Sequence, residues 1–182
     1  MELEIAPGSH DYLIDTLAES VQEFFVDYGF ECTPSDHGTI PPPQAESVMG
    51  SVVGIRNDNF RGGLAFVAPT ELVARTLPVP PDAERQEIQL RDWSAEIVNQ
   101  LAGRFKNKLS ARAFDFDVGT AVCFRGMSIR SAPLLPSSQG VALSFDVASA
   151  NAVRVYLDCS LLVGDGQDAS LPVLPEGGLV FF

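Results

Sequence analysis

The segment DWSAEIVNQLAGRFKNKL, residues 92 to 109, constrains the fold and the function of this chain more than any other stretch. Its apolar residues Ile97, Leu101 and Phe105 recur every four residues, which predicts an amphipathic helix with one buried face. The opposite face carries polar or small residues at helical spacing. These are Asp92, Glu96, Asn99 and Gly103. A carboxylate and a carboxamide one turn apart on an exposed helical face are arranged for a surface chemical task, so we look for function there.

The same period extends this helix and predicts another near the N-terminus. The long helix is expected to run from Asp82 or Glu84 to Ala111. Ser9 is a suitable N-cap and Gly29 a suitable C′ residue for a first helix, whose apolar residues repeat every three or four positions. This first helix is expected to pack on the core and need not carry functional residues.

The remaining segments favour strands. The runs 141–147 and 153–161 alternate apolar and polar residues, which predicts an antiparallel hairpin. Further strands are expected at 47–57, 61–68 and about 119–129. Together with the helices they predict an α+β fold, a two-layer sandwich in which helices pack on a mostly antiparallel sheet of five or six strands.

The rest of the chain is expected to form connections within one domain, residues 1–182. The Pro-rich segment 33–46 is predicted to be a surface loop, because consecutive prolines donate no ladder hydrogen bonds. Pro69 suits the first position of a short helix that ends by Pro78. The tail, 165–182, ends in LVFF and is expected to dock on the sheet or on a second subunit.

Composition points to a protein partner. The chain has 182 residues, 46% of them hydrophobic, which suffices for one buried core. Its 12 basic and 24 acidic residues give a net charge of −12, which argues against nucleic acid or an anionic membrane as a partner. The sequence has no apolar run long enough to span a membrane, and its acidic start lacks the pattern of a signal peptide. We therefore expect a cytoplasmic protein.

Cysteine and histidine usage excludes several classes of site. Cys32, Cys123 and Cys159 are odd in number and lack CxxC spacing, so neither a disulfide framework nor a zinc site is indicated. Cys123 and Cys159 lie in apolar strand patterns and are expected to be small buried residues. His10 and His37 are too few for a histidine metal centre or a Ser-His-Asp triad. The acidic residues are scattered, so we expect the chain to bind no metal cofactor of its own.

The spacing D-x-x-x-E-x-x-N resembles the active-site helix of the CheC/CheX/FliY family of bacterial chemotaxis phosphatases, which dephosphorylate the response regulator CheY. In this chain the spacing comprises Asp92, Glu96 and Asn99. The resemblance includes Gly103 and Lys106 and the upstream stretches GSVVGIRND and RGGLAFVAPTELVARTL, so it covers roughly residues 47 to 162. The single copy of the motif and the chain length resemble CheX more than CheC or FliY, which carry the motif twice. The resemblance implies the same α+β sandwich.

The resemblance also implies a function: hydrolysis of the aspartyl phosphate of a phosphorylated CheY-like receiver domain. In that family the residue equivalent to Glu96 forms a salt bridge with a lysine of the regulator, and Asn99 would orient a water in line with the phosphoryl group. Mg²⁺ would arrive on the regulator. Asp92 would lie at the edge of the site, and Gly103 would mark either a close approach of the partner or a packing constraint. A homodimer paired through an edge strand is compatible with the resemblance.

Two alternatives remain open. Polar residues one turn apart on an exposed helix are often only a solvated face, and Lys106 is assigned no role for that reason. The chain could also keep the fold without the activity, as a binding module for a response regulator or a flagellar-type partner. Pro133 lies later than the proline that often ends the family's following strand, and the 33–46 and 165–182 segments look like additions. The presence of both Glu96 and Asn99 favours the enzyme.

Overall fold

The structure is a computed structural model that describes residues 9–35, 47–58, 60–80, 82–111, 114–126, 139–148 and 151–161. Its helices are α1 (Ser9–Asp27), α2 (Thr70–Arg75) and α3 (Gln86–Ser110). Its strands are β1 (Cys32–Pro34), β2 (Val48–Arg56), β3 (Phe60–Pro69), β4 (Asp117–Val118), β5 (Val122–Gly126), β6 (Gln139–Val147) and β7 (Asn151–Leu161). The expected tail, 165–182, lies outside the described residues, as does His37.

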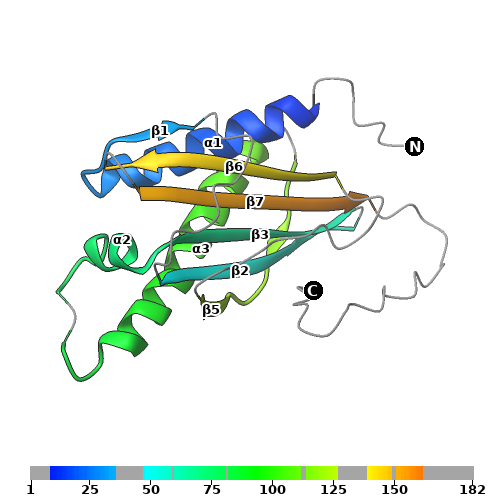
Figure 1. Cartoon of the computed structure of the whole chain (residues 1–182). Helices are drawn as coiled ribbons and strands as arrows, with labels where there is room; N and C mark the ends of the chain where they lie inside the picture. Colours follow the sequence, from blue (N-terminus) through cyan, green and yellow to red (C-terminus); the bar gives the residue numbers. More distant parts are fainter. Residues whose placement is uncertain are drawn as a thin grey trace.

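The strands form one antiparallel sheet in the order β1-β6-β7-β3-β2-β4, with β5 also paired to β2. The predicted hairpin is confirmed as β6 and β7, in which Val147 pairs with Asn151. Figure 1 shows α1 and α3 lying on one face of this sheet, with α2 beside one end of it. The architecture is the predicted two-layer α+β sandwich, although the described part of the sheet has seven strands rather than five or six.

The predicted stop of the first helix is confirmed, because Gly29 has φ of 80° and follows the last turn of α1. The N–H of Phe30 donates to the carbonyl of Phe25 at 2.9 Å, and the N–H of Gly29 donates to that of Val26 at 2.9 Å. This pair of bonds is a Schellman motif, which needs a left-handed residue at the glycine position. The helix begins at Ser9 itself, whose side chain is outside the described residues.

Two boundaries in the first half of the chain differ from the sequence predictions. Residues 33 and 34 were expected in a loop, but Thr33 and Pro34 belong to β1 and pair with Asp146 and Phe145 of β6. Because β1 is at the edge of the sheet, Pro34 can lack an N–H there without breaking a central ladder. Pro69 ends β3 and is the N-cap of α2 rather than its first residue.

The strand predicted at about 119–129 is instead two short strands along one edge of β2. β4 pairs with Ile55 and Arg56, and β5 pairs with the other end of β2. Between them the N–H of Gly119 donates to the carbonyl of Gly54 at 2.8 Å. The long helix begins at Gln86, after a turn that contains the predicted starts Asp82 and Glu84.

The core lies between the sheet and the two long helices. Both layers contribute fully buried aromatic side chains: Phe24 of α1 and Phe105 of α3 come from the helical layer, and Phe66 comes from the sheet. Further buried members are Leu17, Val21, Phe25, Met49, Val53, Leu64, Ile97, Leu101, Phe145 and Val155. Since α3 packs on β2, β3 and α1 with this face, its opposite face is left for solvent. No helix in the described part of the chain is long and apolar enough to cross a membrane.

Candidate functional site

The stripe predicted on the long helix is present on α3. Asp92, Glu96 and Asn99 are exposed and Gly103 is half-buried, so all four reach one solvent-facing side of the helix. The helix presents this stripe because its opposite face is apolar and covered by the sheet and α1. Figure 1 shows how α3 crosses behind β2 and β3, which fixes the direction of its outer face.

The inner face of α3 is held by side-chain packing and by buried hydrogen bonds. Ile97, Leu101 and Phe105 are fully buried, and Trp93 nearly so. The indole N–H of Trp93 donates to the hydroxyl of Thr76 at 2.9 Å, so its one polar atom is satisfied. This packing fixes the rotation of α3 and with it the direction in which the stripe points.

Glu96 is held by a neighbour that the sequence analysis did not single out. The side-chain amide Nε2 of Gln100 donates to Oε1 of Glu96 at 2.9 Å. The hydroxyl of Tyr28 donates to Oε1 of Gln100 at 3.5 Å, a long hydrogen bond that joins α3 to the end of α1. The spacing of four residues between Glu96 and Gln100 is visible in the sequence. The contact with Tyr28 is not, because it joins residues 72 positions apart.

Asn99 has a different setting. Within the part of the chain that the structure describes, its carboxamide makes no hydrogen bond, and neither does the carboxylate of Asp92. Asn99 therefore presents both a carbonyl acceptor and an amide donor to solvent, one turn from Glu96. An acceptor in this position can take a hydrogen bond from a water and orient it.

Gly103 completes the stripe. A Cβ added to it would meet no atom within 4 Å, and it has no positive φ. Neither of the two reasons for a structural glycine, close packing or left-handed backbone, is therefore present among the described residues at this position. The sequence allowed two explanations of Gly103, a close approach of the partner or a packing constraint. The structure gives no support to the packing constraint.

Lys106, the next residue along this side, has a structural contact. Its ammonium lies 3.2 Å from the carboxylate of Asp115 and over the ring of Phe116. The hydrogen bond from Lys106, helped by one from the backbone N–H of Phe116, lowers the pKa of Asp115. Lys106 thus ties the end of α3 to the chain that follows it.

Two further residues of α3 tie it to α1. Arg104 pairs with Asp27 at 2.7 Å, and Lys108 pairs with Glu23 at 2.8 Å and with Glu19 at 3.0 Å. The hydrogen bond to Glu23 raises the pKa of Lys108, against a smaller opposite effect of desolvation. Gln100, four residues before Arg104, contacts α1 through Tyr28, so these three residues form one polar row along the α1–α3 seam.

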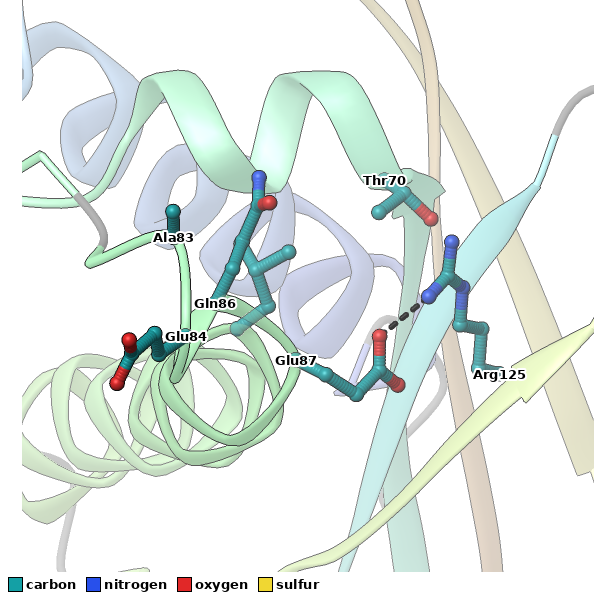
Figure 2. A pocket seen from close by; sticks show the side chains of 7 residues that line it. Thr70, Ala83, Glu84, Gln86, Glu87 and Arg125 are labelled. Carbon is teal, nitrogen blue, oxygen red and sulfur yellow. Dashed lines mark hydrogen bonds and ion pairs between the residues drawn. The ribbon is translucent and has the colours of Figure 1, made fainter.

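A shallow cavity of about 310 Å³ lies beside the first turn of α3, before the stripe begins. Figure 2 shows Glu87 and Arg125 facing each other across it, joined by an ion pair between α3 and β5, while Glu84 points away. Arg125 also donates to the hydroxyl of Ser47 at 2.8 Å. None of the stripe residues lines the cavity, so we assign it to the packing of α3 on the sheet edge.

The cysteines do not form a reactive centre among the described residues. Cys32 is buried, and burial raises the pKa of its thiol to about 12. Cys123 is half-buried on β5, where its thiol donates to the carbonyl of Arg91 at 3.0 Å, and desolvation raises its pKa. The side chain of Cys159 lies outside the described residues. Within the described ranges no group of three or more His, Cys, Asp or Glu side chains could hold a metal ion.

Comparison with solved structures identifies the fold. Chemotaxis protein CheX from Vibrio vulnificus is 20% identical with a TM-score of 0.63, over 81% of this chain and 96% of that one. A CheC-like superfamily protein from Shewanella sp. PV-4 is 18% identical with a TM-score of 0.66, over 81% and 97%. CheX in the CheX–CheY–BeF₃–Mg²⁺ complex from Borrelia burgdorferi is 16% identical with a TM-score of 0.59, over 82% and 96%.

No family model and no curated protein matches the sequence. The structural matches nevertheless show the fold: this chain has the fold of the CheC-like chemotaxis proteins, as the resemblance of the helix motif implied. Among proteins of that fold it is similar to CheX, and the match covers 96% of the Vibrio CheX chain.

Proposed function

We propose that this protein is a phosphatase that hydrolyses the aspartyl phosphate of a CheY-like response regulator in two-component signalling. The observation that carries the proposal is the pair on α3. Asn99 presents a carboxamide with no partner among the described residues, one turn from the exposed carboxylate of Glu96. The Borrelia neighbour was solved in complex with CheY, BeF₃ and Mg²⁺, which supports a receiver domain as the partner.

The chemistry suits this sparse site. An acyl phosphate is already activated, and phosphoryl transfer through a loose transition state needs positioning and charge stabilisation more than a strong base. In the proposed complex the carbonyl oxygen of Asn99 accepts a hydrogen bond from a water and holds it in line with the phosphoryl group. An amide is sufficient for this because it does not have to take the proton.

Glu96 would dock the partner by an ion pair with a lysine of the receiver. Asp92, at the edge of the stripe, would orient rather than react, and Gly103 would let the partner approach the helix backbone closely. The Mg²⁺ would be held by the receiver and neutralise charge on the phosphoryl group. Such a partner would also place the protein in the cytoplasm. A homodimer through a sheet edge stays a prediction of the resemblance.

The test is phosphate release from receiver domains encoded in the same genome, phosphorylated with acetyl phosphate, with and without this protein. We expect Asn99→Ala to lower the single-turnover rate at least about a hundredfold. Its affinity for the beryllofluoride form of the receiver should stay nearly unchanged, because the contact with water matters in the transition state. Asn107→Ala is the matched control, since Asn107 is an exposed asparagine two turns further along α3.

Glu96→Ala should behave differently, with weaker binding and slower turnover together, and the difference in binding from wild type should shrink in high salt. Wild-type turnover in Asn99→Ala would refute the role of Asn99. A protein that binds the beryllofluoride form but never accelerates phosphate release would instead be the non-catalytic docking module. Equal affinity losses in both variants would mean that both residues only dock.

A further inference from the structure

The polar row along the α1–α3 seam continues to the proposed site. Gln100, Arg104 and Lys108 are spaced four residues apart on α3, and each contacts a residue of α1 or of the turn that follows it. Glu96 is the next position in the same row. It lies beyond the end of α1, which Gly29 terminates, and within the described ranges its side chain is hydrogen-bonded to Gln100. The row therefore connects the solvent-exposed margin of the α1–α3 interface to the carboxylate that is proposed to dock the partner.

Gln100 has a defined orientation in this row. Tyr28 is placed by its ring, whose centroid lies 4.8 Å from that of Phe24 and 5.5 Å from that of Trp93. A tyrosine hydroxyl can donate to the carbonyl end of Gln100, which leaves the amide end of Gln100 to donate to Glu96. The order of donors and acceptors thus runs in one direction, from Tyr28 through Gln100 to Glu96.

We infer that Gln100, oriented by Tyr28, is a positioning residue that holds the carboxylate of Glu96 for an ion pair with a cationic side chain of the partner. This inference rests on the proposed function. The bond from Gln100 occupies Oε1 of Glu96, and Oε2 has no partner among the described residues. A flexible glutamate loses rotamer freedom when it binds, so fixing it beforehand lowers the cost of docking.

A double-mutant cycle tests the inference. Gln100→Met keeps the length of the side chain and removes both polar groups, and it is measured in wild type and in Glu96→Ala. The probe is the beryllofluoride form of a receiver domain that the wild-type protein binds. We expect Gln100→Met to weaken binding by roughly two- to fivefold when Glu96 is present. It should have no further effect in Glu96→Ala, because its action passes through that carboxylate.

A second variant tests the same contact by adding a competing cation next to Glu96. Gln100→Lys would supply an internal cation to Glu96, which should compete with the cation of the partner and weaken binding more than Gln100→Met does. Arg104→Met is the control, since Arg104 is the next member of the row and pairs with Asp27 instead. Its effect on binding should be the same with and without Glu96. Urea unfolding of each variant separates a loss of fold from a loss of positioning.

The outcomes distinguish this inference from the proposed function. If Glu96→Ala changes neither affinity nor turnover, the proposed function fails. If Glu96→Ala has its expected effect but Gln100→Met weakens binding equally in both backgrounds, or in neither, the role of Gln100 is overturned and the proposed function stands. Coupling between Gln100 and Glu96, with none between Arg104 and Glu96, supports positioning.

Discussion

The two faces of α3 use their polar groups in opposite ways. On the buried face, the indole of Trp93 donates to Thr76, and the hydroxyl of Ser51 on β2 donates to the backbone carbonyl of Ser94 at 2.6 Å. On the exposed face, Asn99 and Asp92 have no hydrogen bond to any residue that the structure describes. On the first face these groups bond within the molecule, although Oγ of the buried Ser94 has no hydrogen-bond partner among the described residues. On the second face Asn99 and Asp92 leave their polar groups for something outside the molecule.

This difference separates stability from function along one helix. A buried polar group without a partner is costly, so the hydrogen bonds and apolar packing of the inner face contribute to the stability of the fold itself. An exposed carboxamide costs nothing to leave unpaired, because water bonds to it. Substitutions on the inner face should therefore change the free energy of unfolding, and substitutions on the stripe should change binding and turnover.

The largest effect is expected for Leu101→Ala. Leu101 is fully buried between α3 and the sheet, so the truncation should cost about 2 to 5 kcal/mol of unfolding free energy. Glu96→Ala and Asn99→Ala should each change it by less than about 0.5 kcal/mol. Urea unfolding of the three variants checks the comparison. Destabilised Glu96 and Asn99 variants beside an undisturbed Leu101 variant would make the stripe structural and end its functional assignment.

A smaller effect of opposite sign is expected at Gly103. Gly103→Ala should stabilise the protein by up to about 1 kcal/mol, because alanine favours a helix and the added Cβ meets nothing within 4 Å. If a partner approaches this backbone, Gly103→Leu should weaken receiver binding more than Gly103→Ala does while the fold is kept. Thermal unfolding and receiver titration measure the two quantities. Unaltered binding by the leucine variant would show that the partner does not reach Gly103.

The smallest effect concerns the end of α3, where Lys106 pairs with Asp115. Because the pKa of Asp115 is lowered in the folded state, its contribution to stability is present above its unfolded pKa of about 4 and is lost as the pH falls through the folded value. Asp115→Asn should therefore flatten the acid side of the stability profile and leave turnover unchanged. Unfolding at a series of pH values below 5 tests this, and identical slopes for wild type and variant would contradict it.

The sequence predicted the parts of the fold that have long, regular periods. The 3.6-residue period of α3 and the alternation in β6 and β7 are local signals, and the structure confirms both. Short strands have no such period: β1 and β4 contain three and two residues, and they exist because a longer strand lies beside them. Their pairing energy comes from partners far away in the sequence, which a local pattern does not contain.

The candidate site also has parts that the sequence predicts and a part that only the tertiary structure shows. Glu96 and Asn99 could be selected from sequence because helical spacing and a family resemblance both point to them. Gln100 is visible as a neighbour of Glu96, but its orientation depends on Tyr28, which is brought near by the packing of α1 against α3. Contacts across the α1–α3 seam are a property of the tertiary structure, so their contribution to the site could not be predicted from spacing alone.

Gly50 of β2 affects α3 through β5, the strand paired with β2. The ring of Phe124 occupies the place of a side chain at residue 50, since a Cβ there would lie 2.3 Å from the ring. This fit favours one register of β5 against β2. A shift of β5 by one residue would turn each of its side chains to the opposite face of the sheet. Arg125 would then point away from Glu87, and the start of α3 would lose its tie to the sheet. A glycine far from the stripe thus helps to set the alignment of the helix that carries it.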